Sequence, residues 1–341
     1  MTTRKNKKQK RNITKKNKIN KNKINDDFYS VINKSWFNKI NIKQDRVSVN
    51  EYNILQDKVD KQLEIIIDKL KKNKNVNNLY NSYYKLKENK EETEIEVHKI
   101  ITYYEILRKD KDNLWKFLAY CTKYKINYPF YWAIQLDSKN TNNFIVTIGE
   151  NGLGLNDKEH YVKKGKSYET RQKYLSYIEK CYEYISEKNC NGKDVLNIET
   201  DLSKLTRSEI DNRNPELTYN EYNLNSLNKL GFNGRIFFKE LGYKKYPSKI
   251  IVSNPKYLRV ICKTMINNWN SDTWRSYWLF KIFNSYSRFH ERWREHEFNF
   301  YEKYLMGQKK MISLKEFAYK KGVSIILNTQ LTKEYLKNYS N

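Results

Sequence analysis

Large apolar side chains recur at steps of three and four positions between residues 272 and 306, which is the spacing of one face of an α-helix. The members of this stripe are Trp274, Trp278, Ile282, Tyr286, Phe289, Trp293, His296, Phe300 and Tyr304. The stripe predicts one long helix whose aromatic face needs a large partner surface. The chain can provide that surface, because it contains 29 Tyr, 14 Phe and 7 Trp.

Weaker helical spacing covers much of the remaining chain. We expect a helix over about 51–70, started by a capping box of Ser48 and Glu51, and two helices within 76–108. Further helical segments are expected at about 168–189, 193–210, 222–240 and 254–268. With 10 Gly and 4 Pro in 341 residues, a sandwich built on many turns is not expected.

One stretch departs from the helical period. Residues 128–136 and 144–148 are rich in aromatic and β-branched side chains, and the polar run 137–143 separates them. This arrangement predicts a β-hairpin with a loop longer than the minimum. The expected fold class is therefore mainly α, with one small β-hairpin at about 127–149.

The composition argues against several classes of protein. No window approaches 18 consecutive apolar residues, so no transmembrane segment is expected, and the basic N-terminus lacks the apolar core of a signal peptide. The cysteines are too few for a disulfide framework, so we expect reduced thiols at Cys121, Cys181, Cys190 and Cys262. Abundant Asn, Lys, Ile and Tyr indicate an AT-rich genome, such as that of a large DNA virus or a protist. Because neither a transmembrane segment nor a signal peptide is expected, we expect a soluble, intracellular protein or, if the genome is viral, a virion-associated one.

Residues 1–25 form a separate segment with 11 Lys or Arg and no acidic residue. Such a like-charge run contains too little apolar surface to offset the entropy of ordering, so we expect a disordered basic arm. Clustered cations neutralise phosphates, so the arm is a candidate site for a polyanion such as nucleic acid or an anionic membrane surface. The alternative is a solubilising tail whose charge reflects codon bias.

Four sets of motifs, and the capped helix expected at 48–70 between the first and the second of them, occur in a characteristic order. The first is Asp26-Asp27-Phe28-Tyr29 with Asn33 and Trp36, and the second is Asp137, then Gly152-Leu153-Gly154-Leu155 with Tyr161. The third is Ile198-Glu199-Thr200 with Arg213 and Tyr219-Asn220, and the fourth is Leu305-Met306-Gly307-Gln308. Together they resemble the N-terminal half of the neprilysin family of zinc metallopeptidases, which includes neprilysin, endothelin-converting enzyme and bacterial oligopeptidase O. The chain departs from the family pattern at three positions: Asn156, His160 and Asn214.

The resemblance implies a two-lobed, mostly helical peptidase that encloses a large chamber. It covers residues 26–310, which would form the neprilysin-like N-terminal helical lobe that limits substrate size. Residues 311–341 would then be a divergent C-terminal helical tail. In the family the catalytic lobe lies further along the chain, so we expect this chain to be shortened before it.

A zincin needs two histidines at positions i and i+4 of a helix, with a glutamate between them that activates the metal-bound water. The chain has His98, His160, His290 and His296. The last two are six apart and would point about 120° away from each other on a helix, and Arg294 stands where the second ligand would be. We therefore assign no catalytic, metal-ligating or cofactor-binding residue and expect no zinc, the family cofactor. His296 should be partly buried on the stripe, with His290 and Glu291 on a solvated helix face.

Other patterns favour structural roles over chemistry. Gly149, Gly152 and Gly154 lack the Lys-Ser/Thr pair of a phosphate loop, so a turn after the hairpin is expected. Cys181 and Cys190 lack the close spacing of a structural zinc site and are expected to be plain core thiols. The aromatic residues at 269–304 could stack on bases, but their helical spacing favours a core.

By resemblance the chain is a zinc metalloproteinase homologue that we expect to be inactive by itself. Three readings remain open at this point. It is a pseudoenzyme that keeps the lobe as a binding module, the non-catalytic half of a split peptidase, or a basic nucleic-acid or polyanion-binding module on this scaffold. Residues 26–40 carry several large apolar side chains, so we expect them to fold back on the lobe, pair between subunits or dock a catalytic-lobe chain.

Overall fold

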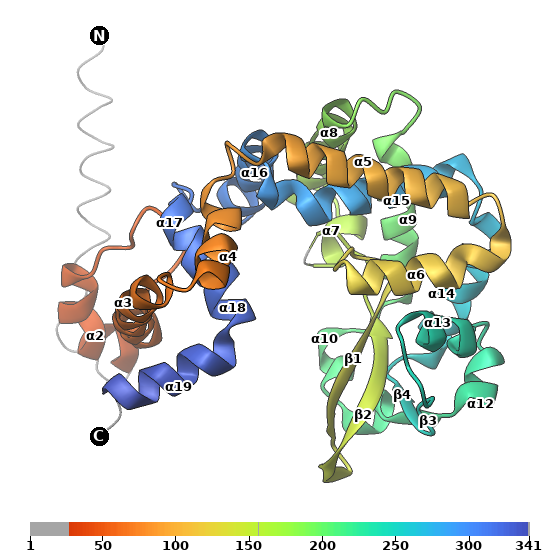
Figure 1. Ribbon diagram of the computed structural model, residues 1–341, viewed down its shortest axis with the longest axis horizontal. Coiled ribbons are helices and arrows are strands. Elements are labelled where there is room, and N and C mark those ends of the chain that lie inside the picture. The colour runs from red at the N-terminus through yellow and green to blue at the C-terminus, as the bar shows by residue number, and fades with distance from the viewer. Residues whose placement is uncertain (1–26, 156, 340–341) are drawn as a thin grey trace.

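The computed structural model describes residues 27–155 and 157–339 (Figure 1). This part of the chain is mainly α-helical with one four-stranded sheet, which confirms the predicted fold class. The predicted basic arm lies outside the described residues.

The longer helices are α2 (Phe28–Lys39), α3 (Glu51–Leu70), α4 (Lys74–Tyr84), α5 (Lys90–Leu107), α6 (Leu114–Lys123), α8 (Lys166–Tyr184), α9 (Gly192–Leu205), α14 (Pro255–Asn268), α15 (Asp272–Tyr286) and α19 (Asn328–Tyr339). The shorter ones are α7 (Glu159–Val162), α10 (Glu209–Asn212), α11 (Pro215–Thr218), α12 (Leu224–Asn228), α13 (Gly234–Glu240), α16 (Glu291–Phe298), α17 (Leu314–Phe317) and α18 (Ser324–Ile326).

The predicted hairpin is the centre of a larger sheet. Its strands are β1 (Phe130–Asp137), β2 (Asn140–Glu150), β3 (Asn220–Tyr222) and β4 (Ile250–Val252), in the order β1-β2-β4-β3. β1 and β2 are antiparallel, β2 and β4 are parallel, and β3 and β4 are antiparallel. The polar loop lies where it was expected, because regular pairing of the two strands starts at Leu136 and Phe144. Within the loop, Ser138 and Lys139 form a two-residue turn, and an irregular stretch follows.

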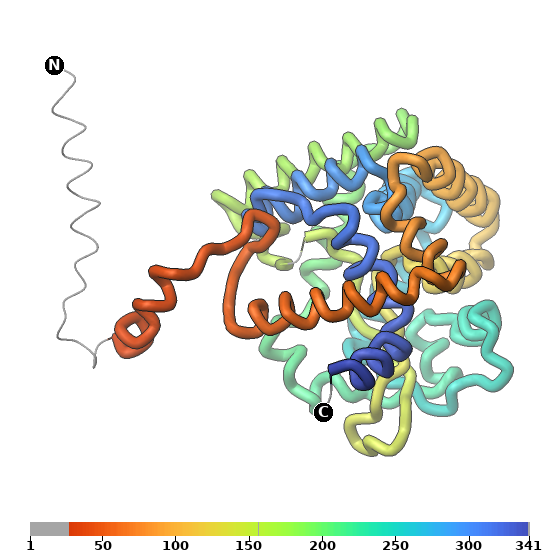
Figure 2. The backbone as a smooth tube through the Cα atoms, turned by 60° about the vertical axis from the view of Figure 1, so that its left-hand side comes forward, coloured from red at the N-terminus to blue at the C-terminus, as the bar shows by residue number. Residues whose placement is uncertain are grey.

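The described residues build two separate hydrophobic cores. The larger core surrounds α15 and takes in α5, α6, α8, α9, α14 and the sheet. The smaller core lies among α3, α4, α19 and the π-helical segment η4 (Ala318–Val323). Figure 1 shows these two groups on opposite sides of the molecule, and in Figure 2 the C-terminal helices again lie along α3. Residues 314–339 are thus helical and cover α3 and α4.

The aromatic stripe is not one continuous helix, so that prediction is wrong between residues 287 and 290. α15 ends at Tyr286, a 3₁₀ turn (η2, Ser287–Phe289) follows, and α16 begins at Glu291. His290 has an extended backbone (φ −122°, ψ 132°), and its side chain accepts a hydrogen bond from the N–H of Trp293. A side chain that caps a new helix in this way competes with continuation of the old one.

The start of α3 also differs from the prediction. Ser48 and Glu51 do not form the capping box; Asn50 is the N-cap residue. Its Oδ1 accepts from the N–H of Asn53 at 2.8 Å, and the Oδ1 of Asn53 accepts from the N–H of Asn50 at 3.0 Å. Asparagine is as good an N-cap residue as serine. The sequence therefore has two possible N-cap residues here, Ser48 and Asn50, and the helix starts after Asn50.

Helix α2 has no buried residue. Its large apolar side chains are largely in solvent, with exposed fractions of 63% for Phe28 and 58% for Ile32. Tyr29 and Trp36 each pack edge-on against Phe37, so these aromatic residues contact one another and not the lobe. The expectation that residues 26–40 fold back on the lobe is therefore wrong for the described part of the segment, and pairing with another chain stays a prediction.

A buried ion pair joins α15, α9 and the segment that follows the hairpin. The Nζ atom of Lys281 lies 2.6 Å from Oε1 of Glu199 and 2.8 Å from the carbonyl oxygen of Gly152. The two side chains are 4% and 0% exposed. The second carboxylate oxygen, Oε2, accepts from the hydroxyl of Tyr161 at 2.6 Å and from the N–H of Gly154 at 3.1 Å. Every charged group of the pair therefore has partners, as a buried ion pair requires.

Two glycines let the main chain approach this ion pair. A Cβ on Gly154 would lie 1.8 Å from the hydroxyl of Tyr174, which itself donates to Glu199 at 3.1 Å. Gly152 has φ +101°, and a Cβ there would lie 2.8 Å from the Cα of Pro129. Of the three glycines expected in a turn after the hairpin, Gly149 lies within β2, and Gly152 and Gly154 lie in an irregular segment with a bend at 154–155. Gly152 and Gly154 allow the backbone to pack close to the buried carboxylate.

We expect Lys281→Met to lower the free energy of unfolding by about 3–5 kcal/mol, because it leaves the Glu199 carboxylate buried without its cation. Adding Glu199→Gln should recover part of that loss, since Gln still accepts hydrogen bonds but carries no charge. Urea titrations followed by tryptophan fluorescence measure both effects. Lys204→Met is the control because it removes only an exposed pair with Asp201 and should change little. A Lys281→Met chain as stable as this control would contradict the structural role of the pair.

Candidate functional site

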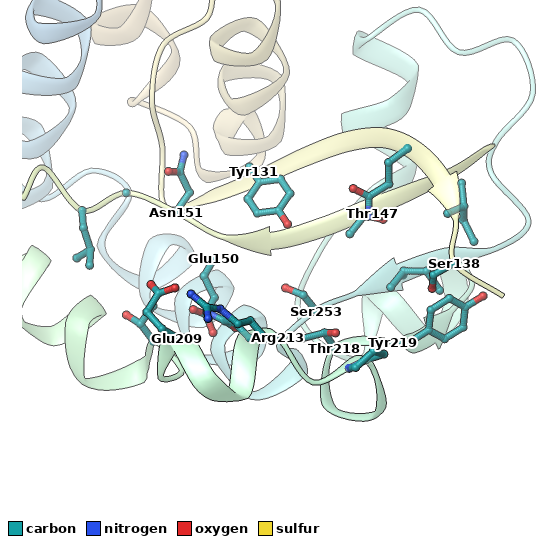
Figure 3. Close-up of a pocket in the computed structure, with 18 of the residues that line it drawn as sticks. Tyr131, Ser138, Thr147, Glu150, Asn151, Glu209, Arg213, Thr218, Tyr219 and Ser253 are labelled. Carbon is teal, nitrogen blue, oxygen red and sulfur yellow. Dashed lines mark hydrogen bonds between the residues drawn. The ribbon is translucent and has the colours of Figure 1, made fainter. Parts of the chain in front are cut away.

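A cleft of about 690 Å³ opens on one face of the sheet (Figure 3). Strands β1 and β2 and the end of β4 form one wall, and the segment that contains α10 and α11 forms the other. Figure 3 shows Glu150, Glu209 and Arg213 near one end of the cleft, and Ser138 and Tyr219 near the other. The cleft is thus large enough for several residues of an extended ligand, with charged groups concentrated at one end.

The ring of Tyr131 forms part of the cleft wall because its cross-strand neighbour is a glycine. Tyr131 pairs with Gly149, and a Cβ on Gly149 would lie 2.3 Å from the tyrosine ring. The ring therefore lies over the bare backbone of β2. Burial raises the pKa of the Tyr131 hydroxyl, and the nearby charge of Glu150 raises it further. The phenol consequently stays neutral and can donate a hydrogen bond at ordinary pH.

Glu150 organises the charged end of the cleft. Both of its carboxylate oxygens accept from the N–H of Arg207 at 3.2 Å, and Oε1 also accepts from the side-chain amide of Asn254. The guanidinium of Arg207 in turn donates to the carbonyl oxygen of Ser253. These bonds tie the end of β2 to the segments after α9 and β4. Arg213 is exposed and faces this end, so it can meet an anionic group of a ligand.

The structure brings together two residues that the sequence motifs had placed far apart. The hydroxyl of Tyr219 donates to Oδ1 of Asp137 at 2.7 Å. This bond and the N–H of Lys139 hold the pKa of the Asp137 carboxyl below its usual range. Lys249 contacts the other carboxylate oxygen at 3.4 Å. These contacts fix the turn of the hairpin against β3 and β4, which indicates a structural role for both motif residues.

The cleft is lined in part by polar and charged side chains that can bind a ligand. Its lining residues include carboxylates, a guanidinium, amides and hydroxyls, but no histidine or cysteine. A nucleophile needs an adjacent base, and none of the lining serines or threonines has a histidine next to it in the cleft. Sequence reasoning had not identified this cleft, because its residues come from five segments without a common period.

The two histidines of the zincin-like stretch have structural partners. His296 is partly buried as predicted, and its Nε2 lies 3.0 Å from the carbonyl oxygen of Tyr177. His290 was expected on a solvated face, and this is wrong: it is 3% exposed and its Nε2 lies 3.0 Å from Oε1 of Glu94. The sequence did not reveal this because the helix restarts at His290 and turns its ring inward. Glu291 is half exposed, as expected.

The described residues do not fit zinc. Within residues 27–155 and 157–339, no three His, Cys, Asp or Glu side chains are grouped so that they could hold a metal ion. Both ring nitrogens of His290 have partners, in Glu94 and the N–H of Trp293, and Nε2 of His296 lies against the carbonyl oxygen of Tyr177. No step of a reaction can therefore be assigned to a metal held by these side chains. The prediction that the chain binds no zinc stays a prediction.

The remaining sequence candidates have the expected structural roles. All four cysteines are free thiols; Cys181 is fully buried and donates to the carbonyl oxygen of Tyr177. Burial raises the pKa of the Cys190 thiol to about 11, so it is not a reactive thiolate. Most aromatic residues at 269–304 belong to the larger core or pack against it; Phe289 and Phe298 do not. In the described part of the chain, no helix combines the length and the apolar character that crossing a bilayer requires.

Comparison with known proteins identifies the family. The sequence model of peptidase family M13 matches residues 24–341, so the chain belongs to this family. This confirms the resemblance to neprilysin-like metallopeptidases. Endothelin-converting enzyme 1 of Mus musculus is 26% identical over 214 residues, which cover 59% of this chain and 27% of that enzyme. Neprilysin-3 of Drosophila melanogaster is 29% identical over 113 residues, or 32% of this chain and 14% of that protein.

Solved structures show the same fold. The zinc metalloprotease ZMP1 of Mycobacterium tuberculosis, in complex with an inhibitor, superposes with a TM-score of 0.80 at 17% identity, over 92% of this chain and 50% of that one. PepO from Lactobacillus rhamnosis HN001 superposes with a TM-score of 0.75 at 14% identity, over 93% of this chain and 52% of that one. The chain thus spans about half the length of these structures and about a quarter of endothelin-converting enzyme 1.

We expect the protein to lose stability as the pH falls below about 6.5, the ordinary pKa of histidine. Burial lowers the pKa of His290, and Glu94 only partly opposes this. The unfolded chain therefore takes up the proton first, and stability is lost from about 6.5 down through the lower folded-state pKa. His290→Asn keeps a helix-capping side chain but cannot titrate, so its stability should depend less on pH in this window.

Thermal unfolding between pH 7 and pH 5 measures this difference. His98→Asn is the matched control, because His98 is exposed and should leave the pH dependence unchanged. Identical pH profiles for wild type and His290→Asn would show that the buried ring does not contribute.

Proposed function

We propose that these 341 residues form the helical, substrate-enclosing lobe of an M13-type metallopeptidase and do not cleave peptides by themselves. The observation that carries the proposal is the engagement of His290 and His296 in helix capping and packing. Both lie where a zincin-like stretch occurs in the sequence, yet each ring serves the fold. The catalytic chemistry would then come from a zinc-bearing lobe outside these residues.

The purified chain should hold no stoichiometric zinc and should not hydrolyse a fluorogenic peptide. The reason is that its described side chains offer no ligand set for a metal and no nucleophile paired with a base. Elemental analysis after dialysis against excess zinc measures the first property, and a fluorescence assay measures the second. One tightly held zinc per chain that is lost in His290→Ala or His296→Ala would overturn the proposal.

We further propose that α2 docks a catalytic-lobe polypeptide. The helix exposes four large apolar side chains, Phe28, Tyr29, Ile32 and Phe37, and a cluster of exposed apolar side chains is typical of a protein-binding surface. Ile42 and Val47, which follow α2 in the chain, are also 55% and 48% exposed. Self-association through the same helix is the alternative partner.

Replacing both Phe28 and Ile32 by Ala should weaken docking by at least about tenfold, because each buried side chain of this size stabilises an interface by roughly 1.5–3 kcal/mol. The melting temperature of the isolated chain should stay unchanged, since neither residue is buried. Copurification with the polypeptide that carries the His-Glu-x-x-His region tests docking, and sedimentation of the chain alone tests self-association. Ile325→Ala, which alters an exposed side chain of α18, is the control. Equal association of the double variant and this control would remove α2 as the docking surface.

A further inference from the structure

Strand β1 forms an open edge of the sheet. In the order β1-β2-β4-β3 it has a neighbour on one side only. No described element other than β2 makes extensive contact with β1. The strand is eight residues long, which is ample for pairing with another extended segment.

The hydrogen bonds of the sheet show which backbone groups of β1 point outward. The carbonyl oxygen of Ile148 accepts from the N–H of Ser253, so the main chain of Ile148 faces β4 and not β1. Its partner in β1 is Trp132, which therefore directs its own N–H and C=O away from β2. Because the direction alternates along a strand, Ile134 and Leu136 share this orientation. Among the described residues, no hydrogen bond from outside the hairpin reaches these three backbone positions.

The edge lacks the features that usually prevent strand pairing. Natural edge strands are protected by proline, by lysine, by an early bulge or by a covering helix. Residues 130–136 contain no charged residue and no proline, and the irregularity of the hairpin comes only after Leu136. Ile134 and Leu136 are 56% and 55% exposed. The edge is therefore available for a ladder of new backbone hydrogen bonds.

We propose that β1 binds an extended peptide by strand addition. Backbone hydrogen bonds at Trp132, Ile134 and Leu136 would supply affinity that is independent of peptide sequence. Alternate side chains of an added strand project to opposite faces of the sheet. One face carries the cleft with Tyr131 and Gln135. The other carries a depression of about 470 Å³ beside Ile134, which also includes Phe144, Tyr243 and Tyr246.

The occupant is a neutral or acidic peptide from another molecule, not a second copy of this chain. Pairing β1 with β1 would bring together two chains of formal charge +27, which repel each other. The net positive charge of the chain favours an acidic peptide. Near the edge, its carboxylates can meet Arg213, which borders the cleft beside Glu150 and Glu209, and Lys245 and Lys249, which border the depression beside Asp137. This inference does not require a zinc-bearing lobe, so it stands or fails separately from the proposed function.

Two variants at one position test the proposal. Ile134→Pro removes an outward N–H but no hydrogen bond between β1 and β2, and edge strands tolerate proline. Ile134→Thr is the matched control, because it keeps the N–H and the β-branched shape. The probe is a fluorescein-labelled peptide of about ten residues with alternating Val and Thr and two Glu at each end. We expect fluorescence anisotropy to show binding to wild type and Ile134→Thr, and a loss of about tenfold or more for Ile134→Pro.

The wild-type protein provides the second arm, in case Ile134→Pro disturbs the fold. A probe whose Val and Thr residues are all N-methylated has no N–H in this stretch to donate to the edge and should bind at least about tenfold more weakly than its parent. Equal binding of both probes, or of wild type and a folded Ile134→Pro chain, would overturn strand addition. A wild-type dimer in sedimentation that Ile134→Pro abolishes would overturn the assignment of the occupant.

Discussion

The ion pair between Lys281 and Glu199 is the interaction on which the arrangement of the larger core depends. A buried lysine in the middle of an aromatic helix is unfavourable unless it pairs with an opposite charge, and Glu199 on α9 provides that charge. The same carboxylate also accepts hydrogen bonds from the hydroxyls of Tyr161 and Tyr174 and from the N–H of Gly154. One buried charge therefore fixes how α15, α8, α9 and the segment after the hairpin lie relative to one another, and so sets the wall of the cleft.

The sequence predicted the parts of the fold that depend on a local period. Helices such as α14 and α8 and the hairpin follow from apolar spacing, and they occur close to their expected residues. The family resemblance rested on motifs whose glycines and Glu199 turn out to share one buried site. Strands β3 and β4 were missed because three residues cannot show a period. The break at His290 was missed because a cap formed by a histidine ring has no apolar signature.

The cleft could not be predicted for a different reason. Tyr131, Glu150 and Arg213 come from separate segments, and only the pairing of β2 with β4 and the anchoring of Arg207 bring these segments together. Such a site depends on long-range contacts, which a local pattern does not encode. The same holds for the open edge of β1, since the hairpin residues do not reveal on which side β4 will pair.

The presence of two cores has a mechanical consequence. The small core of α3, α4, η4 and α19 shares no buried residue with the larger one. The joint between them includes the packing of Tyr83 on Phe289 and Phe317. The guanidinium of Arg294 lies 4.7 Å from the ring centre of Phe317 and donates to the carbonyl oxygen of Ile312, and Lys87 pairs with Glu291. Sparse joints of this kind open at lower free energy than the units that they connect. We therefore expect this joint to open before either core unfolds, which would let the α2-bearing end change its angle while the cleft keeps its shape.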